Sequence, residues 1–285
     1  MTVSVEVFGE AGTPPTQGAP CRLAAEKLSV GYGDTTIIDR LDVAIPTGQV
    51  TTIVGPNGCG KSTLLRTLSR LLNPSAGQVL LDGQDIAGQK PKQVARTLGL
   101  LPQNPVAPDG LTVADLVARG RHPHQSWYRQ WSSDDDRAVA EAMALTSTTE
   151  LADRAVDSLS GGQRQRVWIA MTLAQQTDLV LLDEPTTYLD LAHAVDVLDL
   201  VDELRSEHGK TVVMVLHDLN LAARYSDSII VMRAGQIVAE GPPRDVLTAD
   251  LLASAFGLAS QIVTDPIGGT PMVVPIGRRC TSVRS

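Results

Sequence analysis

A glycine-rich segment of the chain has the composition and spacing of a phosphate-binding loop. It reads Gly55-Pro56-Asn57-Gly58-Cys59-Gly60-Lys61-Ser62 and fits the pattern G-x-x-x-x-G-K-[ST]. A predicted buried strand over residues 50–54 precedes it, and a predicted helix over residues 62–68 follows. Backbone N–H groups and the positive end of a helix dipole attract phosphate anions. A chance glycine turn is the alternative, but the context predicts binding of a nucleoside triphosphate, with Lys61 on the β- and γ-phosphates and Ser62 on Mg²⁺.

Two adjacent carboxylates follow another apolar run. Residues 179–182 are Leu-Val-Leu-Leu, a predicted buried strand, and Asp183 and Glu184 stand at its C-terminal end. Parallel sheets bind their ligands at that edge. The placement suits Asp183 for holding Mg²⁺ and Glu184 for polarising an attacking water as general base. Alone, the pair could be an acidic turn, but beside a phosphate-binding loop we favour catalysis.

A second predicted anion-binding helix N-terminus lies at Leu159-Ser160-Gly161-Gly162-Gln163. Serine is a favoured N-cap residue, and the free N–H groups of a helix start attract anions. An ordinary helix cap is the plainer interpretation of this segment. One nucleotide, however, does not need two such sites on one subunit.

These motifs, in this order, make the chain resemble an ATP-binding cassette (ABC) ATPase over about residues 22–245. Leu-Ser-Gly-Gly-Gln matches the signature of that family without departure. The resemblance implies that the signature closes on the ATP of the opposite subunit, with Ser160 and Gly162 touching the γ-phosphate in trans. It therefore implies a head-to-tail dimer of two copies of the chain with two ATP molecules at the seam.

The resemblance also implies roles for four residues outside these motifs. Gln103 would contact Mg²⁺ and water, and His217 would contact the γ-phosphate. Tyr32 lies where the family has an aromatic residue that stacks on adenine, and Asp190 lies in the loop that couples the two sites. Each could instead be an ordinary structural or surface residue. The commonest family form has Ser-Ala where this chain has Thr187-Tyr188, so the detailed contacts across the dimer stay open.

The motifs and the family resemblance together define one predicted site. The nucleotide-binding residues are Tyr32, Gly55, Pro56, Asn57, Gly58, Cys59, Gly60, Lys61, Ser62, Thr63, Ser160, Gly161, Gly162, Gln163 and Asp190. The catalytic residues are Glu184, His217 and Gln103, and the Mg²⁺ ligands are Ser62, Gln103 and Asp183. Cys59 sits where the loop backbone does the binding. We hypothesise that alkylation of its thiol blocks ATP sterically.

The elements around the motifs alternate between strands and helices. Strands are predicted at residues 22–32, 37–45, 79–81, 97–101, 179–182, 212–216 and 228–232, with helical character from about 104 to 174 and over 190–207. Alternating elements predict an α/β fold with a mainly parallel sheet covered on both faces. With the family resemblance, we expect a P-loop NTPase (RecA-like) core, an antiparallel β subdomain and an inserted α-helical subdomain.

The predicted organisation has three parts. We expect a mobile tail over residues 1–20, with a short strand near 3–8, because this segment is rich in Gly, Pro and Thr. The ATPase domain is expected over 21–257, with the helical subdomain at about 104–174. Residues 258–285 are expected to form a C-terminal extension, with short strands at 262–265 and 272–275, to which the sequence assigns no function.

Composition narrows the setting. The chain has 285 residues and a formal net charge of −8, which argues against nucleic acid as the main partner. Its three cysteines, Cys21, Cys59 and Cys280, are widely spaced and predict a reducing cytosol. The sequence contains neither a secretory signal pattern nor an apolar run of the ~20 residues that a membrane helix needs. We therefore expect any work at a membrane to be done through a partner.

Two kinds of work compete for such an ATPase: driving a membrane permease, or acting as a soluble ABC ATPase on DNA or the ribosome. The second kind usually has two cassettes or long coiled-coil insertions, and neither pattern occurs here. We expect a peripheral protein on the cytoplasmic face of the membrane, bound to separate permease subunits and served indirectly by a substrate-binding protein. We also expect the surface over about residues 104–125 to push a permease loop.

Three segments narrow the cargo by resemblance. They are residues 119–125 (Arg-Gly-Arg-His-Pro-His-Gln), 185–190 and 217–220. Together they resemble the ATPases of iron–siderophore importers, while haem and cobalamin importers have closely similar ATPases and remain alternatives. From physics alone, residues 119–125 would be a solvated loop.

Overall fold

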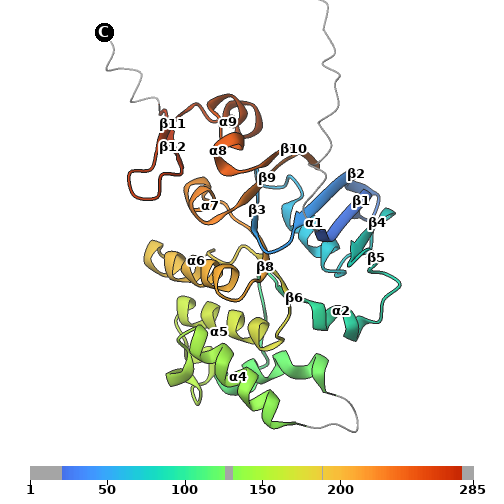
Figure 1. Ribbon diagram of the computed structural model, residues 1–285, viewed down its shortest axis with the longest axis vertical. Helices are drawn as coiled ribbons and strands as arrows, with labels where there is room; N and C mark the ends of the chain where they lie inside the picture. The colour runs from blue at the N-terminus through green and yellow to red at the C-terminus, as the bar shows by residue number, and fades with distance from the viewer. Residues whose placement is uncertain (1–20, 126–130, 188, 278–285) are drawn as a thin grey trace, which may run out of the picture.

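A computed structural model of the chain describes residues 21–125, 131–187 and 189–277. The expected tail over residues 1–20, with its strand near 3–8, lies outside the described residues. So do Tyr188, Cys280 and the C-terminal residues 278–285. Figure 1 shows the chain as an elongated molecule, with helices at one end and a small hairpin at the other.

A six-stranded sheet forms the centre of the molecule. Its order is β10 (Gln236–Gly241), β9 (Ser228–Arg233), β3 (Val50–Val54), β8 (Thr211–Val215), β7 (Leu179–Asp183) and β6 (Leu98–Leu101). All neighbouring pairs are parallel except β10 with β9. Every residue of β3, β7 and β8 is buried, as expected for strands covered on both faces. The predicted, mainly parallel sheet is confirmed.

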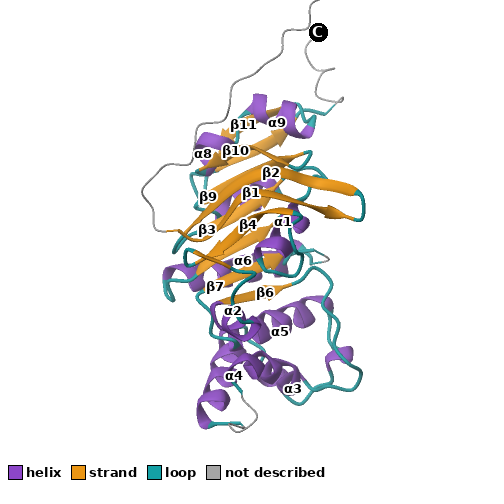
Figure 2. Cartoon of the chain, turned by 90° about the vertical axis from the view of Figure 1, so that its right-hand side faces the viewer, coloured by secondary structure: helices purple, strands orange, loops and turns teal. Residues whose placement is uncertain are grey.

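A four-stranded antiparallel sheet forms the predicted β subdomain. Its order is β2 (Thr35–Pro46), β1 (Cys21–Tyr32), β4 (Ala76–Leu81) and β5 (Gln84–Asp85). A turn at Gly33-Asp34 joins β1 to β2, and Asp82-Gly83 joins β4 to β5. Figure 2 shows this sheet beside the central one.

Alternating side chains of the central strands belong to two separate cores. On one face, residues such as Ile53, Leu181 and Val213 pack with α1 (Lys61–Leu68) and the antiparallel sheet. On the other face, Val54 and Leu182 pack with the remaining helices of the core. The strand β3 is therefore held from both sides. The loop that follows it leaves from a rigid base.

The helices lie between the strands and at both ends of the molecule (Figure 1). They are α2 (Pro91–Thr97), α3 (Val113–Ala118), α4 (Ser133–Leu145), α5 (Gly161–Ala174), α6 (Leu191–Ser206), α7 (Leu219–Tyr225), α8 (Pro243–Val246) and α9 (Ala249–Phe256), with short 3-10 helices η1 (Arg119–His124), η2 (Thr149–Leu151) and η3 (Val156–Ser158). Figure 1 shows α4 and α5 stacked below the sheet in green and yellow, with α8 and α9 near the C-terminal hairpin. The predicted helical insertion between β6 and β7 is confirmed.

The expectation of a solvated loop over residues 119–125 is wrong at Arg121. This side chain is 4% exposed. Its Nε donates to Asp135 Oδ1 at 2.8 Å, and a terminal nitrogen donates to the carbonyl of Ala174 at 2.7 Å. Arg121 therefore ties η1 to α4 and α5. A charged residue can be buried in this way because its charge is paired and its donors are used.

The C-terminal strands predicted near residues 262–265 and 272–275 are confirmed as an antiparallel hairpin of β11 (Ser260–Thr264) and β12 (Pro271–Pro275). The hairpin is not separate from the main body, because Val273 is 5% exposed and belongs to the same core as α6 and α7. Within the described ranges, the helices are all too short or too polar to cross a membrane.

Candidate functional site

The phosphate-binding loop has a backbone shape that its glycines make possible. Gly55 has φ 155°, and a Cβ there would lie 2.2 Å from the carbonyl oxygen of Met232. Gly60 has φ 106° and immediately precedes α1. Both conformations favour glycine. The loop thus curls over the start of α1, and its position between β3 and α1 confirms the predicted strand, turn and helix.

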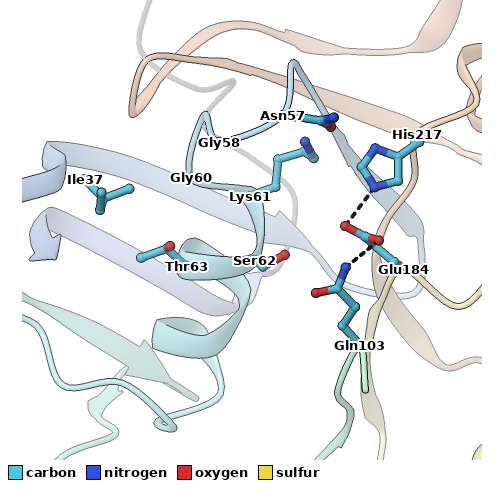
Figure 3. Close-up of a pocket in the computed structure, with 10 residues that line it drawn as sticks. All are labelled: Ile37, Asn57, Gly58, Gly60, Lys61, Ser62, Thr63, Gln103, Glu184 and His217. Atoms are coloured by element: carbon cyan, nitrogen blue, oxygen red, sulfur yellow. Dashed lines mark hydrogen bonds and ion pairs between the residues drawn. The ribbon is translucent and has the colours of Figure 1, made fainter. Parts of the chain in front are cut away.

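A cleft of about 800 Å³ opens above this loop. It is lined by Ile37, Asn57, Gly58, Gly60, Lys61, Ser62, Thr63, Gln103, Glu184 and His217. Figure 3 shows the loop residues on one side of the cleft and the last three residues facing them. The three predicted catalytic side chains come from segments after β6, β7 and β8. Their convergence follows from the parallel sheet, whose strands all end at this edge.

Lys61 is satisfied by the loop itself. Its Nζ donates to the carbonyl oxygens of Gly55 at 2.8 Å and Pro56 at 3.0 Å, and the residue is 5% exposed. These neutral acceptors compensate only part of the cost of burying a cation. An anion in the cleft would be a stronger partner.

Glu184 is the centre of a hydrogen-bond network. Nε2 of His217 lies 2.7 Å from its Oε1, while Thr187 Oγ1 donates to Oε2 at 3.0 Å and Gln103 Nε2 donates to Oε2 at 2.7 Å. Burial alone would raise the pKa of Glu184, but these three donors outweigh it and lower the pKa below its usual range. The carboxylate is therefore ionised at neutral pH. Figure 3 draws the contacts with His217 and Gln103.

The backbone of Glu184 is also unusual. Its φ is 56°, in the left-handed region that non-glycine residues rarely adopt. Such a conformation costs on the order of 1 kcal/mol or more and persists where the surroundings fix it. Here the three side-chain contacts hold the carboxylate in place. The strained turn directs it from the end of β7 into the cleft.

Asp183 lies beneath the cleft and suits a magnesium ion. Ser62 Oγ donates to its Oδ1 at 2.8 Å, whereas Oδ2 is buried, has no hydrogen-bond partner and lies 3.9 Å from an Arg66 nitrogen. Burial raises the pKa of this carboxyl, an effect that the Ser62 hydroxyl and the Arg66 guanidinium oppose. A buried acceptor without a donor is costly. Hydroxyl and carboxylate oxygens are the ligands that Mg²⁺ prefers, so these residues fit that ion.

The predicted signature residues lie elsewhere. Ser160 is the N-cap of α5, and its side chain accepts from the Gln163 N–H at 3.3 Å while Gln163 returns a bond to the Ser160 N–H. Ser160 and Gly161 are exposed. The structure does not bring this segment into the cleft of the same chain. The start of α5 is therefore exposed and separate from the cleft of its own chain.

Asp190 also lies outside the cleft, at the N-cap of α6. Its Oδ1 accepts from the His193 N–H at 2.9 Å and lies 2.7 Å from His193 Nδ1. The His193 ring in turn packs on the signature, because a Cβ on Gly162 would fall 2.8 Å from His193 Cδ2. Asp190 and Gly162 are thus neighbours through one imidazole ring.

Tyr32 and Cys59, two of the predicted nucleotide-binding residues, differ in their exposure to solvent. Tyr32 ends β1, is 49% exposed and does not line the cleft, whereas Ile37 on the neighbouring strand does. Cys59 is 4% exposed, and burial raises the pKa of its thiol. A buried, protonated thiol reacts slowly with alkylating agents. The hypothesis that labelling blocks ATP therefore requires a transient opening of the loop.

Sequence reasoning missed three residues of the site. Thr187 donates to Glu184, Ile37 lines the cleft, and Arg66 approaches Asp183. Thr187 stood in a segment already singled out, and its spacing of three from Glu184 in a turn was an available signal. Ile37 and Arg66 depend on how separate elements pack. The sequence contains no local sign of them.

Comparisons with known proteins agree with this geometry. The profile of the ABC transporter family matches residues 38–187. The ferric enterobactin transport ATP-binding protein of Escherichia coli (strain K12) is 54% identical over 92% of this chain and 96% of its own length. The petrobactin import ATP-binding protein FpuD of Bacillus anthracis is 54% identical over 90% and 94%. A hemin import ATP-binding protein of Thermobifida fusca (strain YX) is 42% identical over 93% of both.

Solved structures share the fold. An ABC transporter described as of metal-chelate type, in an inward-facing conformation, gives a TM-score of 0.78 at 30% identity, over 91% of this chain and 98% of the other. A bacterial ABC transporter cassette solved as a dimer gives a TM-score of 0.68 at 28% identity, over 77% and 98%.

Proposed function

The chain belongs to the ABC transporter family and is an ATPase of that family, and from this premise we propose that it powers uptake of ferric siderophores through a separate membrane permease. The observation that carries the proposal is a gradient of similarity. The highest identities, 54%, 54% and 49%, belong to relatives named for ferric enterobactin, petrobactin and iron(3+)-hydroxamate. A second petrobactin relative is 42% identical, and two relatives named for hemin are 42% and 40% identical. Every one of these matches spans most of both chains.

ATP would bind in the cleft above the phosphate-binding loop. Its phosphates would accept hydrogen bonds from the backbone N–H groups of residues 57–63, at the start of α1. Lys61 would exchange its bonds to the Gly55 and Pro56 carbonyls for phosphate oxygens. That exchange replaces neutral acceptors with charged ones and so favours the bound state.

Glu184 would act as the general base. Its pKa is lowered, so the carboxylate is ready to accept a proton from water at neutral pH. Both of its oxygens already accept bonds, from His217 on one side and from Gln103 and Thr187 on the other. The two oxygens can accept about four bonds and three are used here, so an attacking water can bind Glu184 at Oε1 beside His217. When ATP is bound, His217 and Gln103 would turn towards the γ-phosphate and the metal.

Magnesium would be held by Ser62, Gln103 and Asp183. When bound, the ion neutralises charge that develops on the phosphate oxygens. Ser62 would present its oxygen to the ion, and the Asp183 carboxylate would gain the partner that its Oδ2 atom lacks in the chain alone.

The active form would be a dimer of two copies. The signature at the start of α5 is exposed and lies away from the cleft of its own chain, so it can complete the cleft of a partner. Ser160 and Gly162 would then bind the γ-phosphate in trans, and Asp190 would lie at the seam. The dimeric cassette of similar fold supports this arrangement.

The permease would contact the helical subdomain. Within the surface expected to transmit motion, about residues 104–125, Arg119 is exposed while Arg121 is buried in a structural ion pair. Charge reversal at Arg119 therefore tests coupling, whereas reversal at Arg121 would disrupt the subdomain. We expect Arg119→Glu to lower uptake while ATP hydrolysis by the purified chain is retained.

The decisive experiment is uptake of radiolabelled iron as a ferric siderophore by cells that lack this chain. Complementation with the wild type should restore uptake, and complementation with Glu184→Gln should not. Full uptake in the uncomplemented cells would contradict the proposed cargo. Labelled haem and cobalamin, tested in the same strains, would then identify the alternative importer classes.

A further inference from the structure

The C-terminal hairpin packs on the helix that follows His217. Helix α7 begins at Leu219, and its N-cap Asp218 accepts hydrogen bonds from the N–H groups of Asn220 and Leu221 at 2.8 and 3.0 Å. Figure 1 shows α7 directly below the β11–β12 hairpin. The segment that carries His217 is therefore joined to an element for which the sequence predicted no function.

Asn220 makes the first connection. Its Oδ1 accepts from the Val273 N–H at 2.7 Å, and its Nδ2 donates to the Val273 carbonyl at 3.3 Å. The side-chain amide thus pairs with both polar groups of one residue in β12. Because each bond fixes a different atom of the amide, the pair sets the orientation of α7 as well as its distance from the hairpin.

Arg224 makes the second connection, at the other end of α7. Its Nε and a terminal nitrogen lie 3.2 and 2.5 Å from Asp265 Oδ2. The other oxygen, Oδ1, accepts from the N–H groups of Ile267 and Gly268 at 2.9 and 3.4 Å. Asp265 is 6% exposed. One carboxylate therefore shapes the hairpin turn and holds the helix.

The packing between these two points is apolar and continuous. Val273 lies in the same core as Ala222 and Ala223 of α7 and Leu216 at the end of β8. The opposite side of α7 is fixed to α6 by Tyr225, whose hydroxyl donates to Asp199 Oδ1 at 2.6 Å. A helix as short as α7 is not stable alone in water, so these tertiary contacts determine where it lies.

We propose that Asn220 and Arg224 are positioning residues through which the C-terminal hairpin sets the place of His217 in the cleft. The contact at stake is the 2.7 Å approach of His217 Nε2 to Glu184 Oε1. A catalytic group that is misplaced by about 1 Å costs substantially in rate. Loosening the hairpin should therefore slow hydrolysis with little effect on ATP affinity, because most of the residues proposed to bind the phosphates lie in the phosphate-binding loop and α1. The inference rests on the proposed role of His217.

The test is a double-mutant cycle on the full chain. We would measure the ATPase kcat and the Kd for ATP for Asn220→Ala, Arg224→Gln and His217→Ala, and for each of the first two combined with His217→Ala. Loss of either connection should lower kcat by about two- to tenfold and leave the Kd for ATP unchanged. If the hairpin acts through His217, each double variant should be no slower than His217→Ala alone. Arg224→Lys should restore part of the lost rate.

Thr248→Ala is the matched control. Thr248 caps α9 in the same C-terminal region, where its side chain accepts from the Leu251 N–H at 3.2 Å, and it takes no part in the two connections to α7. We expect this variant to keep the wild-type kcat. Additive losses in the double variants, or an equal loss in Thr248→Ala, would overturn the positioning role. Wild-type turnover in His217→Ala would instead overturn the role proposed for His217 and the inference with it.

Discussion

The two predicted anion-binding sites of this chain, the phosphate-binding loop and the signature, differ in how far one copy of the chain completes them. At the phosphate-binding loop, Lys61, Ser62 and Glu184 already have partners within the chain, and strands on both sides hold the base of the loop. At the signature, the side chains of Ser160 and Gln163 bond to the backbone N–H groups of each other in a helix cap. The first region is ordered in advance for a nucleotide. The second is shaped but open, and its use depends on another molecule.

A substitution in the cleft above the phosphate-binding loop, the site that one copy completes, has the largest expected effect. Glu184→Gln keeps the size of the side chain but removes the base, so we expect kcat for ATP hydrolysis to fall by about 10²- to 10⁴-fold. ATP binding should be retained, and the dimer should persist because ATP is not consumed. Steady-state turnover and gel filtration with ATP measure the two effects. Wild-type turnover would overturn the assignment of the base.

A substitution in the signature, the site that one copy leaves open, should change kcat without changing ATP binding by one chain. In Gly162→Ala the added Cβ would lie 2.8 Å from His193 Cδ2, so either the His193 ring must rotate away or the start of α5 must shift. We expect kcat to fall by about 10²-fold, as for loss of a donor to a reacting oxygen, while one chain binds ATP as before. Isothermal titration and turnover separate these outcomes. Gly88→Ala is the control, because its added atom meets nothing closer than 3.6 Å.

The Arg121–Asp135 ion pair stabilises the helical subdomain that carries the signature, and its contribution to stability can be tested by changing the pH. Asp135 accepts from Arg121, and its pKa is lowered because hydrogen bonds from Arg121 and Ser132 outweigh burial. A lowered pKa stabilises the fold above the unfolded value of about 3.9, and the contribution is lost as pH falls through the folded value. Asp135→Asn should therefore cost about 2 kcal/mol at pH 7, and this cost should shrink gradually as pH falls from about 3.9 through the lower folded pKa.

Denaturant unfolding of both proteins at the two pH values measures this difference. The exposed Asp134 of the same helix provides the control, and Asp134→Asn should change stability by less than about 0.5 kcal/mol. Equal losses for Asp135→Asn at pH 7 and at about pH 2.5, well below the unfolded pKa, would show that charge on Asp135 is not what stabilises the helical subdomain.

The smallest expected effect concerns the base of the nucleotide. Tyr32 is the predicted adenine contact, but Ile37 lines the cleft and Tyr32 does not. If Tyr32 stacks on adenine when ATP binds, Tyr32→Leu should weaken the Kd for ATP by about two- to tenfold. Titration of Tyr32→Leu beside Ile37→Ala decides between the two residues. A larger loss for Ile37→Ala would move the adenine contact to β2.

The sequence predicted the parts of this site that are local. The strand, glycine loop and helix are consecutive, so one segment specifies their geometry. No spacing between Gln103, Glu184 and His217 indicates that they are in contact. Their roles at one site were expected from the family resemblance. Arg121 was placed wrongly because its neighbours Gly120 and Pro123 are typical of exposed turns. Its partner Asp135 has the sequence pattern of a helix cap, and only packing reveals the pair.

The order of strands in the central sheet has a consequence for how the chain is made. Strand β3 is the first of the six to be synthesised, yet its two neighbours, β8 and β9, are among the last. At typical rates of synthesis of about 5–20 residues per second, β3 waits on the order of ten seconds for a partner. During that time β3 and the phosphate-binding loop that follows it have no neighbouring strand of the central sheet to pair with. The residues that bind ATP therefore acquire their shape only near the end of translation, and we expect nascent chains of this protein to need protection by chaperones until β9 has emerged.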